Sequence, residues 1–512
     1  MSAFDRLVAA GRELPDLNGV DQGALPARYK RYPRQGVRLP YPPRRTRNEL
    51  GRLGDLLFSV NGLSRLLWLT DADLTLHHGT PSSAASAIAV VEAARPIPSA
   101  GARYPVELYV CSGTEVPGLP PGIYHYDPPR HALDVVRSGE SRAEVNRALG
   151  AGDGPVPELI VLLTTVFWRT AAKYGAFAHR LLGLDAGVAA EQTLQAAACH
   201  GLPATLHTTW SFERADRILG LDTFAESTVA AVTCGRSVPP STAPLSRPAT
   251  AVSPETSIIG LDHLADLAEV HAASMRATPP PPEPRVREPW GPGRQPDTLT
   301  EHPLPRTEQP LYAAPSLDVA LLTRRSTLSG YSPTAIIPAG LARILRSFQP
   351  GSSVRHLVLV HRVTGLPTGS YHYDATNHTL LRIGLRPDVL PAVPPLLRKE
   401  YGEAAAVLVP VGDYAGGGEL GHRLLTLETG RQLQRAALAA TSAGLACRVH
   451  CDFPGPALLA RMGVDGSGLD ALALMTLGVP PRRSVPADLC FSPALQRTAP
   501  YPGPPSFSGV AW

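Results

Sequence analysis

The chain has 512 residues and a formal net charge of +4, from 48 Lys and Arg against 44 Asp and Glu. A charge this close to neutral over this length gives no reason to expect nucleic acid as a partner. No segment approaches the roughly 18 consecutive apolar residues of a membrane-spanning helix, and the first residues do not resemble a signal peptide. We therefore expect a soluble, cytoplasmic protein with the length of about three ordinary domains.

In chain order, the sequence begins with an arm rich in Arg, Tyr and Pro that we expect to wrap over the surface. A polar, proline-laden linker near the middle cannot pack as one element, except for an amphipathic helix predicted at 257–276. The predicted parts are the arm at 1–45, a first domain at 46–236, the linker at 237–310, a second domain at 311–484 and a tail at 485–512.

The two domains are copies of each other. Residues 118–133, GLPPGIYHYDPPRHAL, match residues 365–380, GLPTGSYHYDATNHTL, at ten of 16 positions with an offset of 365 − 118 = 247. The segment HRLL at 179–182 recurs at 422–425, and an acidic residue and a glycine follow each at matched spacing. A period near half the chain length indicates duplication of a whole domain.

Each copy mixes short apolar strands with helices, and YHYD followed by a short turn is typical of a β-hairpin. The predicted strands are at 106–113 and 158–166 in the first copy and at 356–363 and 404–411 in the second. The runs 189–202 and 431–445 carry small apolar residues at helical spacing and end in Gly-Leu, which is typical of a buried helix with a glycine stop. The sequence therefore predicts an α+β fold, present twice.

The cysteines are spread along the chain without a CxxC motif or a zinc-type spacing, and we expect them to be reduced. Two of them, with His450 between, lie inside an apolar segment, which favours buried structural thiols over a metal site. The six are Cys111, Cys199, Cys234, Cys447, Cys451 and Cys490.

Two motifs of the first copy are candidates for chemistry. Pro98-Ser99-Ala100-Gly101 stands directly before a predicted strand, where small residues let a flat ligand approach the backbone; the alternative is an ordinary tight turn. Lys173-Tyr174 offers two proton-transfer groups whose pKa values a neighbouring cation or an apolar pocket can lower. The alternative for this pair is a solvated helix face.

The second copy carries a candidate phosphate cradle in Arg324-Arg325-Ser326, which places two guanidinium groups beside a hydroxyl. Arg482-Arg483 could complete it. The alternatives are an exposed basic turn and a solvated strand exit. The sequence contains no GxGxxG after a strand, no P-loop, no HExxH and no GxSxG motif.

Together these motifs resemble the SagB-type FMN-dependent azoline dehydrogenases, which have a nitroreductase-like fold and act in the biosynthesis of thiazole- and oxazole-modified peptides, including thiopeptides. The resemblance spans about 46–236 and, more faintly, about 311–484. It is carried in order by PSAGARYPVELYV at 98–110, GLPPGIYHYD at 118–127, KYG at 173–175, the helix at 189–202 and CGR at 234–236.

The resemblance implies FMN at the interface of two protomers, one supplying an Arg-x-Ser phosphate motif and the other the Pro-Ser loop. This chain divides those parts between its copies, because the first copy has ELGRLGDLLFSVNGLSRLL at 49–67 where Arg-x-Ser is expected. The second copy has PGSSVRHL at 350–357 in place of the Pro-Ser loop and Gly416-Gly417 near the Lys-Tyr position. We therefore expect a monomeric, fused pseudodimer with one competent FMN site and a vestigial second one.

The implied reaction oxidises thiazolines or oxazolines in a peptide to thiazoles or oxazoles. Lys173, assisted by Tyr174, is similar to the family's base, and the resemblance implies dioxygen as the oxidant. Leu328 stands where the family has a second basic residue, so Arg482 or Arg483 is expected to compensate. The implied partners are an azoline-containing precursor peptide and a cyclodehydratase. The alternatives are an NAD(P)H-dependent reductase of small molecules and a non-catalytic scaffold of a peptide-maturation complex.

Overall fold

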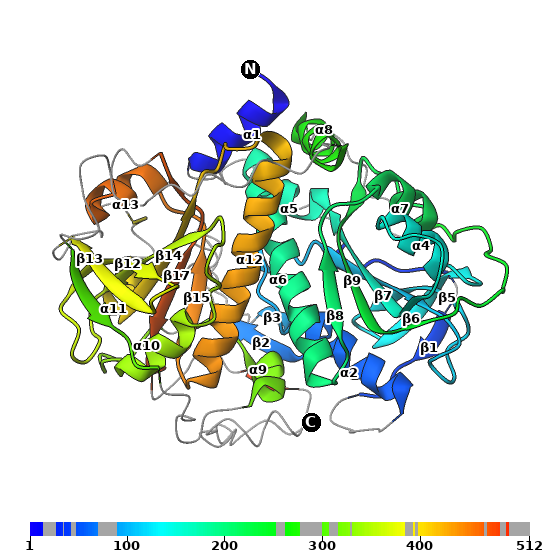
Figure 1. Ribbon diagram of the computed structural model, residues 1–512, viewed down its shortest axis with the longest axis horizontal. Coiled ribbons are helices and arrows are strands. Elements are labelled where there is room, and N and C mark those ends of the chain that lie inside the picture. Colours follow the sequence, from blue (N-terminus) through cyan, green and yellow to red (C-terminus); the bar gives the residue numbers. More distant parts are fainter. Residues whose placement is uncertain are drawn as a thin grey trace.

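The computed structural model has two lobes on either side of a central pair of long helices (Figure 1). It describes residues 1–13, 27–33, 35–41, 48–69, 90–251, 262–276, 299–306, 316–327, 330–384, 393–394, 398–464, 468–481 and 488–490. Within these residues no helix is long and apolar enough to cross a membrane, and no group of three or more His, Cys, Asp or Glu is arranged to hold a metal ion.

Lobe one is an antiparallel sheet of seven strands covered by helices. The strand order is β1 (Gln35–Arg38), β6 (Ala132–Ser138), β5 (Gly122–Asp127), β4 (Val106–Ser112), β7 (Val156–Val166), β9 (Glu226–Val238) and β8 (Ala204–His207). Its helices are α2 (Glu49–Asn61), α4 (Arg142–Ala148), α5 (Phe167–Tyr174), α6 (Ala178–Cys199) and α7 (Phe212–Leu219). Strands β4 and β5 are buried along their whole length, including the polar side chains of Glu107, His125 and Asp127.

Lobe two repeats this architecture. Its strand order is β10 (Thr300–Pro303), β13 (Thr379–Gly384), β12 (Gly369–Asp374), β11 (Arg355–Val360), β14 (Ala406–Gly412), β17 (Leu474–Gly478) and β15 (Ala446–His450), with β16 (Asp470–Ala471) beside β14. Its helices are α9 (Leu317–Thr323), α10 (Pro338–Leu345), α11 (Arg398–Glu403), α12 (Gly418–Ser442) and α13 (Gly455–Met462). The predicted duplicated α+β fold is confirmed.

A small third sheet joins a strand from the C-terminal half of the chain to two strands of the N-terminal half. Strand β18 (Asp488–Cys490) pairs with β2 (Arg65–Leu69), which pairs with β3 (Val90–Ala94). The C-terminal part of the chain therefore returns to the lobe formed by the N-terminal half.

The repeated YHYD segment forms the same hairpin in both lobes. The hydroxyl of Tyr126 lies 2.8 Å from Nδ1 of His131, and that of Tyr373 lies 2.8 Å from Nδ1 of His378. Both histidines have a positive φ, 45° and 56°. An L-residue rarely adopts this conformation, and the tyrosine bond holds the turn in it.

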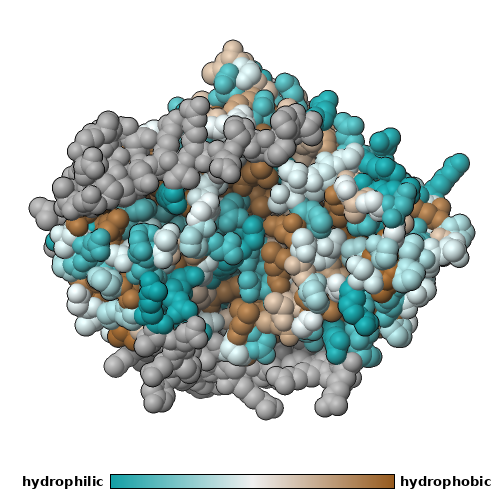
Figure 2. All heavy atoms as spheres, in the orientation of Figure 1, coloured by the Kyte–Doolittle hydropathy of each residue, from teal (hydrophilic) through white to brown (hydrophobic). Residues whose placement is uncertain are grey.

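The lobes meet through α6 and α12, whose reciprocal contacts follow the 243-residue offset of the sequence repeat. A Cβ on Gly187 would clash with the carbonyl oxygen of Leu427, and a Cβ on Gly430 with that of Leu184. Such paired contacts are those of a two-fold interface, here within one chain. Figure 2 shows hydrophobic residues gathered along the seam between the lobes.

Helices α6 and α12 cover the two predicted buried helices and begin earlier than the sequence pattern indicates. Their C-terminal glycines, Gly201 and Gly444, have φ values of 68° and 70°. The predicted glycine stops are therefore confirmed, since this left-handed conformation is the usual end of a helix.

The N-terminal segment is more deeply embedded than the predicted surface arm. Helix α1 (Ala3–Arg12) starts with a capping box between Ser2 and Asp5 and buries Leu7 completely. Further along, Lys30 and Tyr32 are buried in lobe one. The described part of the predicted linker helix is α8 (Asp262–Arg276), which packs on α1, α5 and α12.

Candidate functional site

The Pro98–Gly101 loop connects β3 to β4 and is held by α6. The Ser99 hydroxyl donates to Oδ2 of Asp185 (2.6 Å) and accepts from the N–H of Tyr104 (2.8 Å). The N–H of Ala100 points to the other carboxylate oxygen of Asp185 at 3.4 Å. One carboxylate therefore fixes the turn that the sequence singled out.

The loop has an unusual backbone conformation. Gly101, Ala102 and Tyr104 have φ values of 55°, 53° and 48°. A positive φ carries no penalty for glycine but costs about 1 kcal/mol or more for Ala and Tyr. The surrounding bonds impose this shape, which is more than an ordinary tight turn requires.

Lys173 and Tyr174 lie against this loop at the C-terminal end of α5. A Cβ built on Gly101 would be 2.5 Å from the Tyr174 hydroxyl and 3.1 Å from Nζ of Lys173. Lys173 is 7% exposed, so the pair is not a solvated helix face. The structure thus brings together the two motifs of the first copy.

Two acidic groups beside the loop, Tyr174 and Asp185, have a raised pKa. Burial raises the pKa of Tyr174, and the charge of Asp452 in lobe two raises it further. An apolar pocket was expected to allow a lowered pKa for this tyrosine, whereas in the structure its pKa is raised. Burial likewise raises the pKa of Asp185 to about 7, although hydrogen bonds from Ser99 and Ala100 oppose the change. Tyr174 is therefore suited to donate a hydrogen bond.

Lobe two contributes Arg324, which follows α9 and crosses to lobe one. Its Nε donates to the carbonyl oxygen of Pro96 at 2.8 Å. Burial lowers its pKa to about 10, and the charge of Arg65 in lobe one lowers it further. Arg324 is 3% exposed, and no carboxylate among the described residues forms an ion pair with it. This buried positive charge is suited to an anionic ligand.

The stretch after Arg324 runs beside β15. Ser326 forms a parallel bridge with Cys447, and the N–H of Thr327 donates to the Cys447 carbonyl oxygen at 3.0 Å. Ser326 is half-buried beside this junction, whereas Arg325 is exposed. Leu328, Arg482 and Arg483 lie outside the described residues.

The second-copy counterparts of these motifs make structural contacts. Ser352 accepts hydrogen bonds from Gln432 on α12 (2.7 Å) and from the N–H of Val354 (3.1 Å). Gly417, with φ of 77°, is the N-cap of α12. Neither the loop nor the glycine pair offers a Lys or Tyr of the kind found in lobe one.

Three contributors were not singled out from the sequence. Asp185 is the acidic residue that follows the first HRLL segment, so the repeat contained a signal for it. Arg65 is buried in β2 and acts on Arg324 through its charge. Asp452 follows β15 and acts on Tyr174 across the lobe boundary. The last two depend on long-range contacts, which no local pattern announces.

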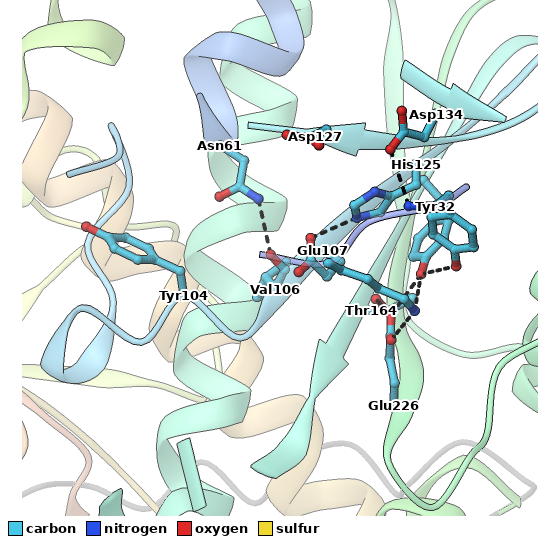
Figure 3. Close-up of polar contacts among 12 residues, drawn as sticks. Tyr32, Asn61, Tyr104, Val106, Glu107, His125, Asp127, Asp134, Thr164 and Glu226 are labelled. Carbon is cyan, nitrogen blue, oxygen red and sulfur yellow. Dashed lines mark hydrogen bonds and ion pairs between the residues drawn. The ribbon is translucent and has the colours of Figure 1, made fainter. Parts of the chain in front are cut away.

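Behind the loop, Glu107 anchors a buried charge network (Figure 3). It pairs with Nη2 of Arg169 at 2.6 Å and lies 3.0 Å from Nε2 of His125. Burial alone would raise the pKa of Glu107, but Arg169 and His125 lower it to about 2. Nη1 of Arg169 donates to the Tyr104 carbonyl oxygen at 3.0 Å, which fixes the end of the loop.

The start of the loop is fixed by Arg95. Its Nη1 donates to Oδ1 of Asn61 (2.6 Å), whose Nδ2 donates to the carbonyl oxygen of Val106 (3.1 Å, Figure 3). The Arg95 guanidinium also lies 4.6 Å from the centre of the Tyr104 ring, within cation–π range. Both ends of the loop are therefore tied to the core of lobe one.

A second buried pair connects the N-terminal segment to the same core. Nζ of Lys30 lies 2.5 Å from Oε2 of Glu226 and 2.7 Å from the Tyr109 hydroxyl. Glu226 also accepts from Thr164 at 2.6 Å (Figure 3). Every member of this cluster has a partner, and it lies away from the lobe boundary, so we interpret it as structural.

The five cysteines with described side chains are free. Burial raises the thiol pKa of Cys447 to about 11 and that of Cys451 to about 12. Cys447 is buried, as predicted for a structural thiol, whereas Cys451 is half-buried.

Comparison with known proteins identifies the type of fold. Residues 83–236 of this chain match the model of the nitroreductase family. A crystal structure of a candidate nitroreductase from Anabaena variabilis superimposes with a TM-score of 0.70 at 20% identity, covering 94% of this chain and 100% of that chain. Both lobes are therefore matched within one chain of that structure.

Two curated relatives align with part of the sequence. The trifolitoxin-processing protein TfxB of Rhizobium leguminosarum bv. trifolii is 29% identical over 140 residues, 26% of this chain and 38% of the relative. A candidate nitroreductase of Methanocaldococcus jannaschii is 30% identical over 107 residues, 21% of this chain and 54% of the relative. The chain thus spans less than two thirds of the length of either one.

Proposed function

We propose that this protein is an FMN-dependent oxidoreductase that oxidises thiazoline or oxazoline rings in a ribosomally made peptide to thiazoles or oxazoles. One observation carries the proposal. Arg324 of lobe two reaches the loop of lobe one that also meets Lys173 and Tyr174. The proposed phosphate-binding group and the proposed base therefore come from different lobes and flank one small-residue loop.

The residues present fit FMN. Its phosphate would be held by Arg324 and Ser326, with Arg65 adding positive charge from lobe one. A buried guanidinium without a carboxylate partner costs free energy that a bound phosphate offsets. The flat ring system would lie beside the Pro98–Gly101 loop. At Gly101 a side chain would clash with the Tyr174 hydroxyl, so glycine lets Lys173 and Tyr174 lie directly against the loop. Arg325, Arg482 and Arg483 remain proposed phosphate contacts.

FMN, when bound, supplies the two-electron acceptor that ring oxidation requires. Lys173 is the proposed base, and its Nζ would accept the proton that leaves the azoline ring carbon. Tyr174, kept protonated by burial, would donate a hydrogen bond and orient either Lys173 or a ring heteroatom. Asp185 would hold Ser99 and Ala100 in place so that the loop keeps its shape.

The peptide part of the proposal is supported by the relative named for the processing of trifolitoxin. An azoline-containing precursor peptide would be the substrate, and a cyclodehydratase of the same pathway a partner, in the cytoplasm. The second lobe-boundary site would be vestigial, since Ser352 and Gly417 have structural contacts there.

The test has two parts. The purified protein is examined for a flavin absorbance spectrum, and an azoline peptide is then incubated with it and followed by mass spectrometry. We expect a yellow protein and a loss of 2 Da for each ring. A colourless protein that cannot be loaded with FMN would favour the scaffold alternative.

A second candidate function is an NAD(P)H-dependent reductase of small molecules, favoured by the match to the nitroreductase family itself. It predicts NAD(P)H consumption with a nitroaromatic compound and no mass change in the azoline peptide. The same purified protein distinguishes the two functions.

A further inference from the structure

Away from the candidate site, a cavity of about 40 Å³ lies where α6 and α12 meet beneath α8. It holds the equivalent of a few water molecules, since one water needs roughly 10–15 Å³ measured in this way. Much of the lining is apolar, and the polar lining residues include Thr165, His179, His271, Ser274, His422 and Arg423. Asp185 does not line it, although it belongs to the same helix as His179.

Two guanidinium nitrogens of Arg423 have no hydrogen-bond acceptor among the described residues, whereas each guanidinium nitrogen of its repeat counterpart Arg180 has one. Arg180 donates from Nε to Leu472, from Nη1 to Gly11 and from Nη2 to Ala471, always to carbonyl oxygens at 2.7–2.9 Å. Nη2 of Arg423 donates to the Thr208 carbonyl oxygen at 2.7 Å. Its Nε and Nη1 are buried and have no partner among the described residues.

Burying the Arg423 guanidinium without an acceptor for these two nitrogens costs free energy. Arg423 is 8% exposed, and burial lowers its pKa to about 10, so it is still charged at neutral pH. A buried donor without an acceptor costs about 1–3 kcal/mol, and more when it is charged. No carboxylate is found among the described residues that line the cavity.

Two histidines beside Arg423 also have ring nitrogens without a hydrogen-bond partner among the described residues. The rings of His179 and His422 stack with centroids 4.3 Å apart and planes 10° from parallel. Nδ1 of His179 and both ring nitrogens of His422 are buried without a partner in the described part of the chain. Burial lowers the pKa of His179 to about 4 and that of His422 well below its usual value, so both rings are neutral at pH 7.

We propose that this cavity binds a small, singly charged oxyanion, such as a short carboxylate or nitrate, with Arg423 as its charge partner. Neutral His422 and His179 would each offer one ring N–H as a further donor. The size of the cavity excludes nucleotides and aromatic acids. A metal ion is disfavoured because the guanidinium would repel it. This site is separate from the proposed flavin site and does not depend on it.

The test uses the full-length protein dialysed into a chloride buffer. Sodium formate or sodium nitrate is then titrated in at constant ionic strength, while thermal unfolding and titration calorimetry are recorded. We expect a saturable rise in the unfolding midpoint with at least one of the two anions. In Arg423→Met the saturable response should disappear, and the midpoint in chloride should be equal or higher because an unpaired buried charge is gone.

Two other variants keep the test decisive if Arg423→Met does not fold. His422→Phe retains the stacked ring but loses both ring nitrogens, and should weaken binding about tenfold or more. Arg324→Ala changes the other site and should retain the full response. The proposal is overturned if neither anion raises the wild-type midpoint beyond chloride. It is also overturned if Arg423→Met or His422→Phe responds like the wild type, or if Arg324→Ala abolishes the response.

Discussion

Nε of Arg324 in lobe two donates to the carbonyl oxygen of Pro96 in lobe one, 2.8 Å away. This bond links a basic motif of one copy to the start of the Pro-Ser loop of the other. Each copy lacks what the other contributes, so neither lobe alone could form the proposed flavin site. We propose that the two lobes have diverged into complementary halves of that site.

Removing the Arg324 guanidinium should weaken FMN binding. Arg324→Ala or Ser326→Ala removes a contact to phosphate that is typically worth roughly 1–3 kcal/mol, which is about a five- to 150-fold change in Kd. Fluorescence titration of the apoprotein with FMN measures this. Arg236→Ala is the matched control, because Arg236 is exposed and paired with Glu158 at 3.1 Å. Loss of flavin from the control alone would place the phosphate in the other half.

Lys173→Ala should separate turnover from cofactor binding. We expect flavin content to stay unchanged while azoline oxidation slows by about 10²–10⁴-fold, the usual effect of losing a general base. Tyr174→Phe should slow the reaction less, since the ring is retained and one hydroxyl is lost. Stopped-flow flavin spectra and peptide mass give both rates. Full activity in the Lys173→Ala, Tyr174→Phe double variant would rule this pair out as the proton-transfer groups.

Asp185 should make stability depend on pH. The pKa of Asp185 is about 7 in the fold against an ordinary value of 3.8, so the folded state binds more protons between these pH values. The free energy of unfolding should therefore fall, by at most roughly 4 kcal/mol from this group, as pH rises from about 4 to about 7. Above pH 7 the contribution of Asp185 should be constant. Asp185→Asn keeps an oxygen for Ser99 and should remove this part of the slope. Urea unfolding at pH 5 and pH 8 compares the wild type with Asp185→Asn. Equal changes in the free energy of unfolding of both proteins would contradict the assignment of this pH dependence to Asp185.

The contact between α6 and α12 should tolerate no side chain at Gly187 or Gly430. Gly187→Ala and Gly430→Ala each place a methyl group against a backbone carbonyl of the opposite helix. We expect each to lower the free energy of unfolding by about 1–3 kcal/mol or more, with a loss of bound flavin, because the lobes must move apart. Gly152→Ala, which meets nothing within 4 Å, is the control. Wild-type stability and flavin content in Gly187→Ala would mean that the crossing is loosely packed.

The repeat made most of the fold predictable. The YHYD hairpins, the strands around them and the helices ending at Gly201 and Gly444 all have local signatures, and the structure has them where the sequence indicates. The loop at Pro98–Gly101 and the Lys173-Tyr174 pair were also recognisable. That they meet at Gly101 depends on how α5 packs beside the loop, which no local pattern encodes.

The rest depends on contacts between distant segments. Lys30 belongs to the segment predicted to wrap over the surface, and its burial could not be predicted because its partner Glu226 is 196 residues away. Arg65 lies in the stretch 49–67, which the sequence distinguishes only by its lack of an Arg-x-Ser motif. Its effect on the pKa of Arg324 depends on a contact between the two lobes. A buried ion pair or charge cluster has no sequence signature when its members come from different elements.

The central claim, one flavin site shared by two complementary lobes, is tested most directly by stoichiometry. Flavin absorbance is measured against protein concentration on the peak of a size-exclusion column with light-scattering detection. We predict a monomer of 54.3 kDa polypeptide mass that carries one FMN when saturated. Two FMN per chain, or an obligate dimer that alone retains the flavin, would contradict the claim.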